Sequence, residues 1–307
     1  MVRRVRRLAR RLYERVLERE LGGVPAHVAV IQDGNRRYAD RKGAGTAVGH
    51  RAGAETTEAM LDWCAELGIE ELTLYAFSTE NFERPPEERE ELFDLIEDKL
   101  YQFADDEKVH EDEVRIRAIG QLDLLPARVR EAIEYAETRT ADYDSQYLNV
   151  ALAYGGRAQL LGAARDLAGA IEDGRLASDD IDVAAVEARL AERPARAVDL
   201  IIRTGGDERT SNFLPWHANG NEAAVFFCAP YWPEFSRVDF LRAIRTYQSR
   251  QESWRRTRSE RALALASAVG ADRPLVRRLT EKVGDLPELE VDVEAEGEEA
   301  ESELLAD

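Results

Sequence analysis

The side chains best suited to chemistry come directly after apolar runs of the sequence. Asp33 follows the run His27–Gln32 and opens the segment Asp-Gly-Asn-Arg-Arg-Tyr, residues 33–38. A carboxylate at the end of a buried strand can be presented to a divalent cation, and Mg²⁺ is typically held by one or two carboxylates together with substrate phosphates. Gly34 allows a sharp turn, after which backbone N–H groups and arginines can face an anion. Taken alone, the segment is as consistent with an ordinary Asp-Gly turn that carries exposed arginines.

A second group of polar residues follows the apolar run Glu71–Phe77. The segment Ser78–Pro85 places Arg84 after a cluster of small polar side chains, and a guanidinium in that position suits a diphosphate. A purely structural interpretation is also available, in which Ser78 caps a short turn and Pro85 opens the next helix.

The densest group follows the run Asp199–Arg203. Arg203, Arg209 and Ser211 surround a Gly-Gly loop and offer forked charged donors, a hydroxyl and free backbone amides. These groups match the needs of a diphosphate. Glu222, just before the next apolar run, could complete the ligation of a cation. Three loops suited to anions, each at the end of a separate run, are difficult to explain as simple turns.

The elements that must position these loops alternate regularly along the chain. Strand-like runs occur at residues 27–32, 71–77, 114–120, 147–154, 199–203 and 223–228. Helical patterns occur at residues 49–67, 87–106, 126–140, 157–171 and 239–256. This alternation predicts a single α/β domain with a mostly parallel central sheet of about six strands, flanked by helices. Ligands bind such sheets at the carboxyl ends of the strands, where all three polar groups lie.

The composition narrows the class of protein. A net charge of −19 argues against nucleic-acid binding, because phosphate contacts need clustered positive charge. Abundant carboxylates with few lysines predict adaptation to high salt, and therefore a halophilic source. Cys64 and Cys228, the two cysteines, form neither a metal-ligand spacing nor a disulfide framework, which fits a cytoplasmic protein. No apolar run approaches the roughly 20 residues that cross a bilayer.

The two ends of the chain differ from its centre. Residues 1–22 are rich in arginine, and apolar residues at helical spacing predict a basic amphipathic helix. Such a helix either packs on the domain at residues 23–285 or rests on the anionic inner face of the membrane, as a peripheral contact. Residues 286–307 are mostly acidic and predict a disordered tail.

These segments, in this order, resemble the cis-prenyltransferase family, which includes undecaprenyl and dehydrodolichyl diphosphate synthases. The resemblance extends from about His27 to Phe240. It rests on the motifs at residues 27–38, 49–50, 74–82, 154–157, 199–213 and 231–235. The version Arg36-Arg37-Tyr38 resembles archaeal and eukaryotic members of the family more than most bacterial ones.

The resemblance implies a Mg²⁺-dependent prenyl transferase, a homodimer with a hydrophobic tunnel between sheet and helices. It assigns Asp33 and Glu222 to the metal, and Asp33, Asn81 and His50 to catalysis. For the allylic diphosphate it assigns Gly34, Asn35, Arg36, Arg37, Tyr38, His50, Ser78, Thr79, Glu80, Phe82 and Arg84. For isopentenyl diphosphate it assigns Arg203, Arg209, Thr210 and Ser211.

The reaction implied is sequential condensation of isopentenyl diphosphate with an allylic diphosphate, for which geranylgeranyl diphosphate is the expected primer. The expected product is a long polycis-polyprenyl diphosphate of undecaprenyl size, a precursor of glycosyl carrier lipids. The alternative is a non-catalytic, membrane-associated partner subunit of a heteromeric synthase. Such partners tend to lack the Asp-Gly-Asn cluster, which is present here.

Three positions leave the details open. The neutral amide of Asn81 is a poor base, so orienting the substrate suits it better. His50 has an ordinary titration range suited to proton transfer, although it can equally serve as a hydrogen-bonding partner of a phosphate. Thr46 stands where many family members have an arginine, so the phosphate contacts on this side are not settled by the resemblance.

Overall fold

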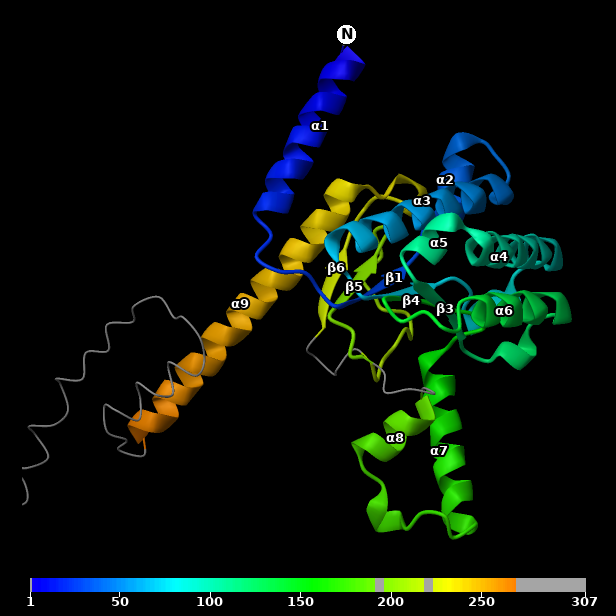
Figure 1. The fold of residues 1–307 in the computed structure, drawn as a ribbon, viewed down its shortest axis with the longest axis vertical. Helices are drawn as coiled ribbons and strands as arrows, with labels where there is room; N and C mark the ends of the chain where they lie inside the picture. Colours follow the sequence, from blue (N-terminus) through cyan, green and yellow to red (C-terminus); the bar gives the residue numbers. More distant parts are fainter. Residues whose placement is uncertain (1, 191–195, 218–222, 269–307) are drawn as a thin grey trace, which may run out of the picture. The chain divides into compact units, whose positions relative to one another are not determined.

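The chain is described here by a computed structural model that covers residues 2–190, 196–217 and 223–268. A parallel sheet of six strands lies at its centre (Figure 1), in the order β3-β4-β2-β1-β5-β6. The strands are β1 His27–Ile31, β2 Glu71–Tyr75, β3 Val114–Ile119, β4 Gln146–Ala151, β5 Leu200–Arg203 and β6 Ala224–Phe227. All six predicted strands are confirmed, and every neighbouring pair is parallel.

Helices occupy most of the connections. They are α1 Val2–Arg19, α2 Asn35–Lys42, α3 Thr46–Leu67, α4 Pro86–Asp105, α5 Glu107–Glu111, α6 Ala127–Arg139, α7 Gly156–Glu172, α8 Val183–Leu190 and α9 Arg237–Ala268. The five predicted long helices are confirmed, whereas α2, α5 and α8 are too short for an apolar period to reveal them. Within the described residues, no helix combines the length and apolar character needed to span a bilayer.

The main apolar core lies on one face of the sheet. Leu148 and Val150 of β4 belong to it, while Ala151 belongs to the smaller cluster on the other face. This alternation follows from the two-residue period of a strand. Helices α3, α4 and α6 contribute Met60, Phe93 and Ile133 to the main core. The smaller cluster contains residues of the loop after β5.

The strand order creates a crevice at the carboxyl edge of the sheet. The chain runs from β1 to strands on one side of it, and later returns to place β5 on the other side. In an open α/β sheet, ligands bind where the connections diverge in this way. The residues that follow Ile31 and Arg203, which are paired in register, therefore meet at the expected place for a site.

The chain divides into two compact units, residues 1–248 and 249–307. The first contains the sheet and all of α1, which occupies most of the predicted helical segment 1–22. Of the second, the structure describes only the final turns of α9. The predicted boundary after residue 285 and the predicted acidic tail, 286–307, lie outside the described residues.

Candidate active site

Asp33 is fixed at the crevice by its own backbone. Its N–H donates to Ile31 O at 3.0 Å and to Thr204 Oγ1 at 3.0 Å, and its carbonyl accepts from the Thr204 hydroxyl at 2.7 Å. The carbonyl also accepts from the Trp232 N–H at 2.9 Å. The loops after β1 and β5 are therefore joined at this residue, and its carboxylate has a defined position.

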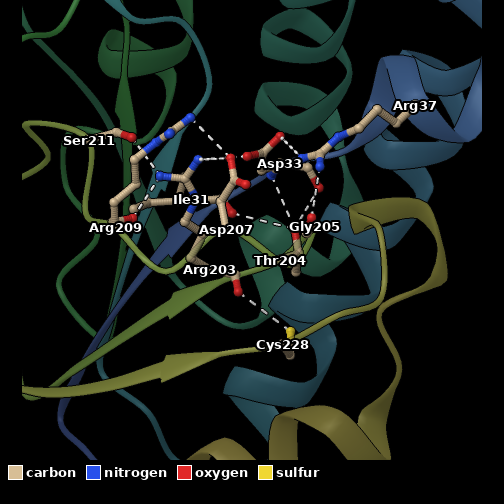
Figure 2. Close-up of polar contacts among 10 residues, drawn as sticks. All are labelled: Ile31, Asp33, Arg37, Arg203, Thr204, Gly205, Asp207, Arg209, Ser211 and Cys228. Carbon is tan, nitrogen blue, oxygen red and sulfur yellow. Dashed lines mark hydrogen bonds and ion pairs between the residues drawn. The ribbon is translucent and has the colours of Figure 1, made fainter.

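The Asp33 carboxylate lies between two guanidinium groups (Figure 2). Arg37 Nη2 donates to Oδ1 at 2.9 Å, and Arg203 Nη2 donates to Oδ2 at 2.7 Å. Burial by itself raises the pKa of this carboxyl, but the hydrogen bonds from Arg203 and Arg37 outweigh burial and hold the pKa below its ordinary value. Asp33 is therefore ionised at neutral pH, as a metal ligand must be.

Arg203 organises the loop that follows β5. Its side chain is only 4% exposed. Besides Asp33, it donates from Nη1 to Arg209 O at 2.6 Å and to Ser211 Oγ at 2.5 Å, and from Nη2 to Asp207 Oδ2 at 3.2 Å. A buried guanidinium with four acceptors holds a rigid position, because its donors form a planar fork.

Two predicted residues of this loop are more open. The Arg209 side chain is largely exposed and contacts Asp207 Oδ2 at 3.0 Å. Thr210 is exposed, and its carbonyl accepts from the Phe213 N–H at 3.0 Å. Asp207 was not predicted, although its place between the two arginines of the motif could have indicated it. It bridges Arg203 and Arg209 and neutralises part of their charge.

Two glycines, Gly34 and Gly205, allow the loops after β1, β5 and β6 to approach one another closely. Gly34 has φ 102°, and a Cβ atom there would lie 2.6 Å from Tyr231 Cδ1. Gly205 has φ 86°, and a Cβ atom there would lie 2.7 Å from Arg37 Nη2. Its carbonyl also accepts from Arg37 Nη1 at 2.9 Å. Both positions have a left-handed backbone; a side chain at Gly34 would collide with Tyr231, and one at Gly205 would displace the Arg37 guanidinium from Asp33.

Neighbouring arginines of α2 are directed to different partners. Arg37 contacts Asp33 and Gly205, so it lies on the same side as Arg203. Arg36 is mostly exposed and forms an ion pair with Glu88 at 3.9 Å. Successive side chains on a helix point about 100° apart, which explains the separation. The motif places both residues on one helix, but only Arg36 joins the group around Arg84.

A second cationic group forms between α2, α3 and α4. Arg84 donates from Nη1 to Glu88 Oε1 at 2.5 Å, and the Glu88 side chain is 10% exposed. Thr46 Oγ1 donates to Glu91 Oε2 at 3.1 Å, so the position that is often arginine contacts α4 instead. Glu88 was not predicted. Glu88 pairs with the two guanidinium groups, of Arg36 and Arg84, that could otherwise bind a diphosphate.

His50 is a neutral side chain beside this group. Burial lowers its pKa to about 4, and the nearby Arg84 charge lowers it further than the opposing charge of Glu88 raises it. Its Nε2 is buried and has no hydrogen-bond partner among the described residues. At pH 7 the His50 ring is therefore neutral, and its buried Nε2 can accept or donate one hydrogen bond. It carries no positive charge with which to pair a phosphate.

The predicted residues of the loop after β2 mostly form contacts that hold the loop itself in place. Asn81 Oδ1 accepts from the Ser78 N–H at 2.9 Å, and Thr79 N–H donates to Tyr154 O at 3.0 Å. Glu80 is exposed. The Phe82 ring packs against Phe77, 5.1 Å between centroids, and so marks the boundary between the polar loop and the main core.

Asn35 lies where α2 meets α3, whereas Tyr38 contacts cations of its own helix. Asn35 Oδ1 is buried with no partner among the described residues, and a Cβ atom on Gly53 of α3 would lie 2.4 Å from it. Tyr38 is stacked by cations of its own helix, with Lys42 Nζ 5.6 Å from the ring centroid.

The donors present fit a magnesium ion. Each carboxylate oxygen of Asp33 accepts one hydrogen bond and has a further lone pair. Glu222, the second predicted ligand, lies outside the described residues. Among the described residues, no group of three His, Cys, Asp or Glu side chains could hold a metal. Mg²⁺ is typically held by one or two carboxylates and completes its shell with phosphate and water, so the fit rests on the further lone pairs of Asp33.

Comparisons with known proteins identify the family of this chain. Residues 31–255 match the prenyltransferase family model described as undecaprenyl diphosphate synthase. Two relatives carry the name tritrans,polycis-undecaprenyl-diphosphate synthase (geranylgeranyl-diphosphate specific). The Halobacterium salinarum protein is 64% identical over 290 residues, 94% of this chain and 96% of the relative. The Haloarcula marismortui protein is 62% identical over 292 residues, again 94% and 96%.

A solved structure shares the fold. Lavandulyl diphosphate synthase from Lavandula x intermedia, in complex with dimethylallyl diphosphate, is 34% identical and has a TM-score of 0.68. The match covers 73% of this chain and 95% of that one. With the family model spanning most of the chain and two relatives matching it almost end to end, the chain belongs to the undecaprenyl diphosphate synthase family of cis-prenyltransferases.

Proposed function

We propose that this chain adds isopentenyl diphosphate units to geranylgeranyl diphosphate and releases a polycis-polyprenyl diphosphate of undecaprenyl length, for use as a glycosyl carrier lipid. The observation that carries the proposal is the Asp33 carboxylate held between Arg37 and Arg203, where the polar loops of β1 and β5 meet. The names of the relatives support the primer and the product.

In each condensation the C–O bond of the allylic diphosphate breaks and its electron pair leaves with the diphosphate. The double bond of isopentenyl diphosphate supplies the electrons of the new C–C bond, and loss of one proton forms the cis double bond. Arg36 and Arg84 stabilise the charge on the leaving group, and Arg203 and Ser211 hold the incoming diphosphate. When the primer binds, its diphosphate competes with Glu88 for the guanidinium groups of Arg36 and Arg84.

Asp33, together with Glu222, would hold Mg²⁺. The ion, when bound, supplies Lewis-acid stabilisation of negative charge on the diphosphate. The low pKa of Asp33 keeps this ligand ionised at neutral pH. Titrating Mg²⁺ into chelator-treated protein should restore turnover, and binding of Mg²⁺ together with a non-hydrolysable diphosphate should weaken in Asp33→Ala.

The growing hydrocarbon would occupy a tunnel through the main core, between the sheet and helices α3 and α4. The rings of Phe82 and Phe93, whose centroids are 6.4 Å apart, would line the start of this path. Each added CH₂ removed from water contributes roughly 0.8 kcal/mol, which retains intermediates on the enzyme.

The decisive experiment incubates purified protein with isopentenyl diphosphate, Mg²⁺ and C10, C15 or C20 allylic primers, and sizes the products by mass. We expect the C20 primer to be used best and to give a product of undecaprenyl length. Equal use of all primers would overturn the primer assignment. Failure of the isolated chain to join any five-carbon units would favour the alternative, a non-catalytic partner subunit.

A homodimer completes the proposal. Leu161 of α7, Ile181, and Val183 of α8 are exposed apolar side chains, and a second copy of the chain would cover such a surface. Light scattering should give twice the monomer mass, and Leu161→Asp should shift that mass towards the monomer. A wild-type mass equal to one chain would contradict this.

We also propose that the cytoplasmic enzyme touches the membrane through α1. Arginine dominates this helix, while Leu12, Tyr13 and Val16 are exposed on it. Glu18 and the adjacent Glu20 pair with Arg237 and Arg245, at 2.7 and 2.8 Å. The arginines of α1, together with the exposed Leu12, Tyr13 and Val16, suit an anionic lipid surface.

Co-sedimentation with vesicles tests the membrane contact. The full chain should bind vesicles that contain anionic phospholipid more strongly than zwitterionic vesicles, and Leu12→Glu should weaken binding without changing turnover of a short, soluble primer. Equal binding by wild type and variant would exclude α1 as the contact.

A further inference from the structure

Helix α7 begins without a side-chain cap of its own. Its N-cap residue is Gly155, and the first N–H groups of any helix need acceptors from elsewhere. Asn212, in the loop after β5, supplies two of them. Its carbonyl accepts from the Gly156 N–H at 2.9 Å, and its Oδ1 accepts from the Arg157 N–H at 2.8 Å. The loop that carries Ser211 thus caps a helix that follows a different strand.

This junction is tightly packed on both sides. A Cβ atom on Gly156 would lie 2.1 Å from Pro215 Cδ and 2.9 Å from Asn212 O. A Cβ atom on Gly155 would lie 2.8 Å from Thr79 Oγ1 and 3.4 Å from Asn212 Nδ2. Three segments therefore meet at Asn212: its own loop, the start of α7, and the loop after β2 that contains Thr79.

The backbone next to Asn212 is held in an unfavourable conformation. Ser211, Asn212 and Leu214 have φ of 47°, 61° and 48°, in the left-handed region. Residues other than glycine seldom adopt it, Asn being among the least disfavoured. Such a conformation persists only where surrounding contacts impose it. Here the contacts are the Asn212 hydrogen bonds to α7, the Arg203–Ser211 hydrogen bond, and the Phe213 ring stacked on Tyr75 at 4.5 Å.

We propose that Asn212 is a positioning residue for the isopentenyl diphosphate side of the reaction. By capping α7, its side chain fixes the left-handed turn that directs the Ser211 hydroxyl and the Arg209 carbonyl toward Arg203. It also sets the separation between this loop and the Thr79 loop. The inference rests on the proposed function, because it takes Ser211 and Arg203 as the groups that hold isopentenyl diphosphate.

The test compares Asn212→Gly with Asn212→Ala. Glycine removes the Oδ1 cap but tolerates the left-handed backbone, whereas alanine removes the cap and opposes that backbone as well. A side-chain cap contributes roughly 0.5–2 kcal/mol, which corresponds to about a 2- to 30-fold effect on an equilibrium. We expect KM for isopentenyl diphosphate to rise about tenfold in the glycine variant and further in the alanine variant. KM for the allylic primer should change by less than about threefold.

A matched control removes a cap of the same kind elsewhere. Asp106 caps α5 by accepting from the Lys108 N–H at 2.8 Å. Asp106→Ala should lower Tm by an amount similar to Asn212→Gly and leave both KM values unchanged. Should Asn212→Gly fail to fold, Asn212→Ser, whose hydroxyl can still cap α7, should raise KM for isopentenyl diphosphate less than Asn212→Ala does; equal KM values in these two variants would contradict the inference.

The outcomes separate this inference from the proposed function. If wild-type protein forms product and Asn212→Gly lowers Tm with no change in KM for isopentenyl diphosphate, Asn212 is only a helix cap and the inference is wrong. An equal rise in both KM values would also contradict it. If wild-type protein forms no product from any primer, the proposed function fails instead.

Discussion

The two groups of cations in the candidate active site differ in how completely they are ordered. Arg203 is buried and donates to four acceptors, and it holds Asp33 and Ser211 in place. Arg36 and Arg84 lie on the other side, where Arg36 is 61% exposed and both face the carboxylate of Glu88. Carboxylates face the arginines of both groups, so the difference lies in burial: the Arg203 side chain is 4% exposed and held by four acceptors, whereas Arg36 is open to solvent.

This difference fits the two substrates that we propose. Isopentenyl diphosphate must enter afresh in every cycle, and a preformed site keeps the ordering cost of each binding event low. The primer side has to accept a chain that changes length. Arg36, which is exposed, and Arg84, which is partly buried, can rearrange around Glu88 at a lower cost than the buried Arg203 network.

The largest expected effect comes from removing the carboxylate that joins the two sides. Asp33→Ala should reduce kcat on the order of 10³-fold, because the metal ligand and its fixed charge are lost together. It should also lower the free energy of unfolding by about 1–3 kcal/mol, because buried Arg203 loses a partner. Steady-state turnover and urea unfolding measure the two effects. Asp33→Asn, similar in shape, should retain more stability but not more activity; unchanged turnover in either variant would refute the role of Asp33.

The preorganised side should be the more sensitive to a change of cation. Arg203→Lys should raise KM for isopentenyl diphosphate by about 30- to 100-fold, because an ammonium group cannot replace a planar fork that serves four acceptors. Arg209→Lys, at an exposed position of the same loop, is the control and should have a smaller effect. If both variants behave alike, burial of Arg203 has no functional importance.

The His50 environment should appear in the pH dependence of stability. The pKa of His50 is lowered to about 4 in the fold, whereas the unfolded chain has the ordinary value near 6.5. The unfolded state therefore binds the extra proton between these values, and stability falls as pH falls below 6.5. Between about pH 6.5 and 5 the free energy of unfolding should drop by about 1.5 kcal/mol. His50→Gln should flatten this slope, while His217, whose pKa burial also lowers, contributes equally to both proteins. Equal slopes would contradict the assignment.

The smallest effect is expected on the exposed side. Arg36→Lys should raise KM for the allylic primer by only about two- to threefold, because an exposed cation with one long ion pair contributes little. Kinetics at saturating isopentenyl diphosphate measure it. An effect as large as that of Arg203→Lys would contradict the proposed difference between the ordered Arg203 group and the more adaptable group of Arg36 and Arg84.

Much of the site could be predicted from local sequence. Asp33, Arg84 and Arg203 each stand after an apolar run, and parallel strands bring their carboxyl ends to one edge. The pairing of Arg203 with Asp33, 170 residues apart, could not be read from either segment alone. Glu88 was missed because an acidic residue in the first turn of a helix is ordinary.

The sequence by itself determined the parallel α/β sheet, the loops at its carboxyl edge and the family, because apolar periodicity and motif order depend on neighbours along the chain. Only the tertiary structure decided which arginine faces which carboxylate. Arg36 and Arg37 are adjacent, yet helix geometry sends them to opposite groups. The neutral state of His50 and the cap that Asn212 provides for α7 likewise arise from burial and contact between distant segments, which no single segment encodes.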